Sequence, residues 1–202
     1  MASQIEDTGT RRVQVADPGP LGLAAFALTT FILSMANAGW MPAAAAPVFL
    51  TVALFYGGFT QIIAGSWEFF NRNTFGATAF SSYGAFWIAL ATLILLEIRH
   101  VVVFGAAGGA ALGTFLLAWT IFTVYMMFAS FRLNGALTAV FVALVLAFVC
   151  LTVGAYTGSA TWTQWGGYTG VLTALLAWYT SAAGVINGVS GRTVLPVWPY
   201  SH

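Results

Sequence analysis

The chain carries no Asp, Glu, Lys, Arg or His between Arg132 and Arg192, where residues 133–191 read LNGALTAVFVALVLAFVCLTVGAYTGSATWTQWGGYTGVLTALLAWYTSAAGVINGVSG. A transmembrane helix needs about 20 mostly apolar residues, so this stretch is long enough to cross a bilayer, turn and cross again. Soluble domains carry charge on about a quarter of their residues. Here 5% of 202 residues are charged and 60% are apolar. We therefore predict a protein whose surface faces lipid.

Cutting the chain at charged residues and at turn-forming Gly, Pro and Asn predicts six spans. They cover about residues 21–38, 48–67, 76–96, 104–129, 134–156 and 166–188, with a last outer turn that runs from Tyr156 to Gly167. We expect residues 1–17 to be a disordered tail, residues 18–190 the membrane transport domain, and residues 191–202 a short C-terminal tail. The predicted fold class is an all-α integral membrane protein with six transmembrane helices in a compact bundle.

The arginines predict an orientation, because basic residues are enriched in cytoplasmic loops. The N-terminal tail, the second and fourth loops and the C-terminal tail contain Arg11, Arg12, Arg72, Arg132 and Arg192, against Arg99 alone on the other side. This distribution predicts a multi-pass protein of the cell membrane with both termini in the cytoplasm. Aromatic side chains in the predicted outer turns agree, since they favour the headgroup level; alternatively, they only pack the loops. These aromatics are Trp40, Tyr156, Trp162 and Trp165.

Composition excludes several classes of function. A formal net charge of +1 provides no electrostatic footprint for nucleic acid. The chain contains no lysine, which removes retinal and pyridoxal Schiff-base chemistry. Cys150 is the single cysteine, so no intrachain disulfide or cysteine zinc cluster can form. With only His100 and His202 available, a histidine metal site or a Ser-His hydrolase is also disfavoured. We expect neither an enzyme nor a bound cofactor or metal.

Polar groups inside the apolar spans are the candidate site, because each costs free energy in lipid unless it faces a partner or a wet cavity. Four predicted spans carry one hydroxyl or amide stripe each: Thr30, Ser34 and Asn37; Tyr56 and Thr60; Thr78, Ser81 and Ser82; and Thr169, Thr173, Thr180 and Asn187. A Ser or Thr can instead bond to a carbonyl of its own helix. If the four stripes face one another inside the bundle, they predict a pathway for a small neutral or singly charged solute, since multivalent ions require rings of charged side chains.

Glu68 is the one carboxylate close to a predicted span, at the cytoplasmic end of the second span and ahead of Arg72. Two interpretations remain open for it. It acts as a proton relay or gating group, or it forms a salt bridge at the helix end.

Three blocks of the sequence match the pattern of a known family. They are Asp17-Pro18-Gly19-Pro20-Leu21-Gly22-Leu23; the stretch from Phe55-Tyr56-Gly57-Gly58 through Asn73-Thr74-Phe75-Gly76 to Ser82-Tyr83-Gly84-Ala85-Phe86-Trp87; and Gly191-Arg192-Thr193-Val194-Leu195-Pro196. The first resembles the Asn-Pro-Ala-Pro-Leu-Gly-Leu signature of the acetate uptake transporter family, which includes SatP/YaaH-like and yeast Ato-like proteins. The resemblance implies a six-helix, proton-coupled carrier of acetate and related carboxylates, succinate included, whose bacterial members form hexamers with a pathway through each subunit.

The resemblance also implies site residues. The family's apolar constriction matches Phe26, Tyr83 and Leu144, on the first, third and fifth spans, at depths that would let them meet. Leu21 of the signature is an expected pathway residue. Asp17 replaces the family's Asn, and we expect it to keep a capping role and to act as a possible proton or gating group. Its negative charge would repel a carboxylate at a pore mouth.

Our functional hypothesis is that a small carboxylate binds among hydroxyl, amide and helix-end N–H groups and crosses the apolar neck as the acid or with a co-transported proton. A lone charge at mid-bilayer costs about 2.5–3.5 kcal/mol, and neutralisation removes most of that barrier. The partners expected are therefore a small carboxylate, protons and the lipid bilayer. Two alternatives stay open: a pore for another small solute such as ammonia, formate, water or glycerol, or a membrane assembly subunit that transports nothing.

Overall fold

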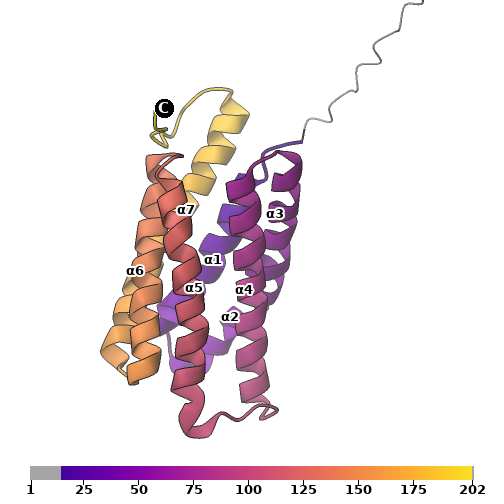
Figure 1. The fold of residues 1–202 in the computed structure, drawn as a ribbon. Coiled ribbons are helices and arrows are strands. Elements are labelled where there is room, and N and C mark those ends of the chain that lie inside the picture. The colour runs from indigo at the N-terminus through magenta and orange to yellow at the C-terminus, as the bar shows by residue number, and fades with distance from the viewer. Residues whose placement is uncertain (1–14, 202) are drawn as a thin grey trace, which may run out of the picture.

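The computed structural model describes residues 15–201 of the chain. Within that range six helical segments are long and apolar enough to cross a membrane, and they run side by side in one bundle (Figure 1). The helices are α1 (Gly19–Asn37), α2 (Phe49–Leu54), α3 (Gln61–Phe70), α4 (Thr74–Ile98), α5 (Gly108–Ser130), α6 (Gly135–Thr157) and α7 (Ala160–Ser190). The predicted all-α fold with six spans is confirmed.

Each connection between two of the six spans lies at one of the two ends of the bundle (Figure 1). The start of α1, the α3–α4 turn, the α5–α6 turn and the C-terminal segment share one end, which we call the terminal end (Figure 1). The turns that follow α1, α4 and α6 lie at the opposite end, which we call the far end. Along the bundle, α7 packs against α1 and α6, α5 packs against α6, and α3 packs against α4.

The second span is interrupted by two irregular segments. It runs from Ala43 to Phe70 and so begins earlier than expected, with a 3-10 helix (Ala43–Val48) in which Pro47 removes a backbone donor. α2 and α3 are then joined by a π-helical turn, Phe55–Thr60. A side chain at Gly57 of this turn would collide with Thr29 of α1, so the glycine permits close approach of the two helices.

The last outer turn is shorter than the sequence predicts. α6 ends at Thr157 and α7 begins at Ala160, because Gly158 adopts a left-handed φ of 65° and Ser159 caps the next helix by accepting a bond from the Trp162 backbone N–H. Trp162 and Trp165 therefore lie on the first turns of α7, where they are 44% and 56% exposed. The expected loop up to Gly167 was wrong: that glycine stays helical and lets α7 touch the backbone of Ala38.

Candidate functional site

Two cavities lie inside the bundle, one after the other along its length. The larger has a volume of about 400 Å³, lies toward the terminal end, and is lined by α1, α3, α4, α6 and α7. We call it the terminal cavity. The smaller, of about 50 Å³, is lined by α1, α4, α5, α6 and α7, and it includes Asn37 at the end of α1. We call it the far cavity.

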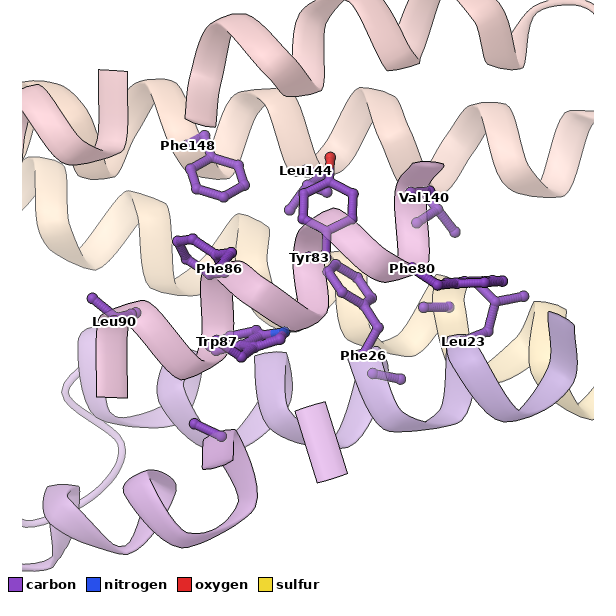
Figure 2. Close-up of a cluster of buried hydrophobic side chains, with 14 of the residues drawn as sticks. Leu23, Phe26, Phe80, Tyr83, Phe86, Trp87, Leu90, Val140, Leu144 and Phe148 are labelled. Atoms are coloured by element: carbon purple, nitrogen blue, oxygen red, sulfur yellow. The ribbon is translucent and has the colours of Figure 1, made fainter. Parts of the chain in front are cut away.

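The three residues expected to form a constriction come together between these cavities. Phe26 of α1 and Leu144 of α6 line both cavities, and Tyr83 of α4 lines the terminal cavity. The Phe26 and Tyr83 ring centroids are 5.6 Å apart. Figure 2 shows the three side chains grouped between Phe80 on one side and Phe86 on the other. All three are at most 5% exposed, and we call them the neck.

Unpaired polar atoms lie on both sides of the neck. Gln61 lines the terminal cavity and is fully buried, and neither its Oε1 nor its Nε2 has a partner within residues 15–201. In the far cavity, Thr30 Oγ1 and Trp87 Nε1 are buried and likewise lack a partner in the described part of the chain. Leaving such a group unpaired costs about 1–3 kcal/mol, so these atoms are expected to bind a solute or water.

Local backbone geometry places Gln61 at this depth. It is the first residue of α3, directly after the π-helical turn, and π-helical turns occur frequently at functional sites. Neither Gln61 nor Trp87 is among the pathway residues predicted from the sequence. Gln61 could have been found as an amide within an apolar span, and Trp87 as an indole in the middle of a helix rather than at its interfacial end.

The predicted hydroxyl stripes divide into residues that line the cavities and residues that do not. Thr30, Ser34 and Asn37 line the far cavity, and Thr180 and Asn187 line the terminal cavity. The remaining stripe and pathway residues line neither cavity: Leu21, Tyr56, Thr60, Thr78, Ser81, Ser82, Thr169 and Thr173. For these residues a place on the solute pathway stays a prediction that the two cavities do not support.

Bonding within the helix explains several of these exceptions. Thr60 Oγ1 donates to the Phe55 carbonyl at 3.1 Å, and Thr169 Oγ1 donates to the Trp165 carbonyl at 2.8 Å. Thr173 is fully buried and donates to the Thr169 carbonyl at 2.8 Å. These hydroxyls are satisfied by their own helices, which is the alternative open to any Thr in an apolar span. Leu21 is 42% exposed on the outside of α1.

Asn187 uses its amide to hold the C-terminal segment. Its Nδ2 donates to the Leu195 carbonyl at 2.8 Å, and its Oδ1 accepts from the backbone N–H groups of Val194 at 2.7 Å and Leu195 at 2.9 Å. The segment then continues to Val197, which lines the terminal cavity, and to Trp198, whose carbonyl accepts from the Gly135 N–H at the start of α6 at 2.9 Å. Asn187 therefore shapes the mouth of the cavity through the chain it anchors.

We expect Asn187→Ala to release this segment. The loss of three hydrogen bonds of about 1 kcal/mol each raises the fraction of molecules with a detached C-terminal segment by at least about tenfold. Trypsin should therefore cleave after Arg192 correspondingly faster in detergent. The rate is measured by mass spectrometry of the released peptide. Asn71→Ala, at an exposed amide in the α3–α4 turn, is the matched control. Equal cleavage rates in the two variants would contradict the anchoring role.

Both carboxylates near the terminal end line the terminal cavity. Glu68 is 2% exposed, and its Oε2 accepts from Asn73 Nδ2 at 3.0 Å, while Asn73 Oδ1 caps α4 by accepting from Gly76 N at 3.0 Å. Asp17 Oδ1 accepts from Gly19 N, at the start of α1, at 2.8 Å. The N-cap position of that helix is Pro18 and has no side-chain cap, so Asp17 does not take the N-cap position that was expected of it. No arginine within residues 15–201 pairs with Glu68, so the salt-bridge interpretation is replaced by a bond to the Asn73 amide.

The terminal cavity therefore has two carboxyl groups in its outer part and only uncharged side chains at the neck. No Lys, Arg or His belongs to its lining within the described chain. A solute that enters from the terminal end meets two carboxylates first and the Gln61 amide next. Such an arrangement repels anions when these carboxyl groups are ionised, and it places two groups that can take up or release a proton beside the entering solute.

The chain is similar in sequence and in structure to known membrane transport proteins. The sequence model described as the GPR1/FUN34/yaaH family matches residues 4–202. The succinate-acetate/proton symporter SatP of Escherichia coli is 36% identical, with 91% of this chain and 96% of the relative aligned. Acetate permease A of Emericella nidulans is 39% identical over 92% of this chain and 67% of its own length. A solved structure of the bacterial acetate channel SatP superimposes with a TM-score of 0.85 at 36% identity, covering 91% of this chain and 99% of that chain.

Proposed function

The chain belongs to the GPR1/FUN34/yaaH family, and from that premise we propose that it is a membrane channel or transporter for acetate and related small carboxylates, succinate included. One observation carries the proposal. An apolar neck separates two cavities, and buried polar atoms without partners lie on each side of it. A small solute with a polar head and a short apolar body can satisfy those atoms and pass the neck.

On the far side, the unpaired groups favour an oxygen acceptor. Trp87 Nε1 is a donor only, and the Thr30 hydroxyl can donate as well. A carboxylate oxygen is a strong acceptor for both. Charge-assisted bonds of this kind are about twice as strong as neutral ones.

On the terminal side, Gln61 both donates and accepts. A protonated carboxyl group can donate its O–H to Oε1 and accept from Nε2, so both amide atoms are satisfied by one solute. A carboxylate anion offers acceptors alone and leaves Oε1 without a donor. We therefore propose that the solute crosses the neck as the neutral acid, which also removes most of the cost of about 2.5–3.5 kcal/mol for a lone charge at mid-bilayer.

Proton coupling follows from this chemistry. We propose Glu68 and Asp17 as the groups that exchange the proton, since both line the terminal cavity and Glu68 is bonded to an amide rather than to a cation. The E. coli relative is named a proton symporter. In this scheme a proton enters and leaves with each carboxylate.

Uptake into proteoliposomes tests the function. We expect labelled acetate to enter faster than into protein-free liposomes, and the protein-dependent rate should rise at least about threefold when the external pH is lowered from neutral to mildly acidic, because the acid form is then more abundant. Competition by propionate, succinate, formate, ammonia and glycerol ranks the solutes. A rate indifferent to pH would favour a passive anion channel. Strong competition by ammonia or glycerol alone would favour another pore, and no flux at all would favour a subunit without transport.

The remaining assignments concern placement and assembly. We propose that both termini are cytoplasmic, because Arg72, Arg132 and Arg192 lie at the terminal end whereas Arg99 lies at the far end. Arg11 and Arg12, with most of the proposed tail 1–17, fall outside the described residues.

The division of the chain into a tail, a membrane domain 18–190 and a C-terminal tail 191–202 remains a proposal. The hexamer that the family resemblance implies is likewise a proposal. The named relatives above are transport proteins, and we propose no enzymatic activity and no cofactor.

A further inference from the structure

Tyr83 contributes its ring to the neck, but its hydroxyl is held outside the passage. Tyr83 Oη donates to Thr123 Oγ1 of α5 at 3.0 Å, and Thr123 Oγ1 donates in turn to the Trp119 carbonyl at 2.7 Å. Tyr83 is 3% exposed and Thr123 is fully buried. Figure 2 shows the hydroxyl pointing away from Phe26, on the opposite edge of the ring.

This bond joins α4 and α5, whose backbones make few close contacts and whose side chains meet mainly through aromatic rings. α4 packs mainly against α3, and α5 mainly against α6. Within residues 15–201, Tyr83–Thr123 is the one side-chain hydrogen bond between α4 and α5. The Tyr83 ring packs against two further aromatic rings. Its centroid lies 5.2 Å from that of Phe122, which meets it edge-on, and 6.3 Å from that of Phe141. Those contacts limit the tilt of the ring, and the hydrogen bond holds its hydroxyl end toward α5.

A tyrosine hydroxyl in this place would otherwise need a different partner. The terminal cavity that Tyr83 lines also contains the unpaired Gln61 amide. Without Thr123 as acceptor, the hydroxyl is buried and unsatisfied, and turning toward the cavity is the available way to regain a bond. The neck would then present a polar atom and a displaced ring to the solute.

We propose that Thr123 is a positioning residue for the neck: by accepting the Tyr83 hydroxyl it keeps the passage lined by carbon atoms and keeps the ring in a position that sets the width available to the solute. This inference rests on the proposed function. Thr123 itself touches no solute. Its effect is on selectivity, since a ring held in place slows an acid with a longer apolar tail, such as butyrate, more than it slows acetate.

Thr123→Val tests the proposal, because valine keeps the shape and removes the acceptor. In proteoliposomes we expect the ratio of acetate to butyrate uptake to fall about fivefold, the value of one hydrogen bond. Thr123→Ser retains an acceptor and should restore the ratio. Thr120→Val is the matched control: Thr120 lies one turn earlier on α5, is 8% exposed, and bonds to Thr152 of α6 rather than to the neck. Its ratio should stay at the wild-type value.

A double-mutant comparison separates positioning from packing. In the Tyr83→Phe background there is no hydroxyl to hold, so adding Thr123→Val should leave the uptake ratio where Tyr83→Phe alone puts it. An equal change in both backgrounds, or no change in either, would overturn the inference. Wild-type acetate flux is the separate measure of the proposed function. Its absence would remove both proposals, whereas normal flux with an unchanged ratio would remove only this one.

Discussion

Replacing Gln61 by Leu is expected to reduce carboxylate uptake by about tenfold or more, because two hydrogen bonds to the passing acid are lost at the neck. The two side chains are similar in size, and Gln61 is fully buried with both amide atoms unpaired. The substitution should therefore leave the fold as stable as before, or more stable by up to about 1–3 kcal/mol, since a desolvated amide is removed. Flux in proteoliposomes and the thermal midpoint in detergent are the two measurements.

Loss of transport together with unchanged or higher stability is the signature of a binding group, because function then opposes stability at that position. Gln164→Leu makes the same chemical change at an exposed position of α7, and we expect it to transport normally. If Gln61→Leu transported at the wild-type rate, the amide would not be part of the pathway. If it lowered flux only in proportion to lost folded protein, its role would be structural.

Replacing Phe26 by Ala should open the neck. The ring lines both cavities, so its removal joins them and admits longer acids. A pocket discriminates about tenfold or more for a methylene group that does not fit, and we expect butyrate uptake relative to acetate to rise by that factor. The ratio of the two labelled fluxes measures the change independently of the amount of protein inserted.

The control for lost packing is Phe49→Ala in α2. Phe49 is 4% exposed, close to the 5% of Phe26, and it lines neither cavity. Each substitution should cost about 3–5 kcal/mol of stability, so both variants are compared at a temperature where they remain folded. Selectivity should change for Phe26→Ala alone. A similar shift in Phe49→Ala would mean that general loosening of the bundle, rather than the neck, sets selectivity.

Some features of the site could be predicted because they depend on position along a helix. Phe26, Tyr83 and Leu144 were expected from a family resemblance and from their similar depth in three parallel spans, and the structure brings them together. Depth is read from residue counts, since an α-helix rises about 1.5 Å per residue. Which side of each helix faces the pathway cannot be read in that way.

The hydroxyl stripes illustrate the difference. Thr30 and Thr173 both belong to predicted stripes, yet Thr30 lines the far cavity with an unpaired oxygen and Thr173 donates to its own helix. Every Thr in an apolar span has both possibilities. The outcome depends on helix rotation and on close approaches such as that of Gly57 to Thr29, which are properties of the packed bundle.

By itself the sequence determined that this protein lies in a membrane and crosses it six times. Long segments without charge are stable in the hydrocarbon core of a bilayer as helices, and this depends only on the residues that each segment contains. Only the tertiary structure decided which polar groups are left without partners beside the neck. Gln61 reaches that place through a π-helical turn, and Tyr83 is held there by Thr123, forty residues further along the chain. Such pairings arise when separate helices pack, and no local pattern in the sequence specifies them.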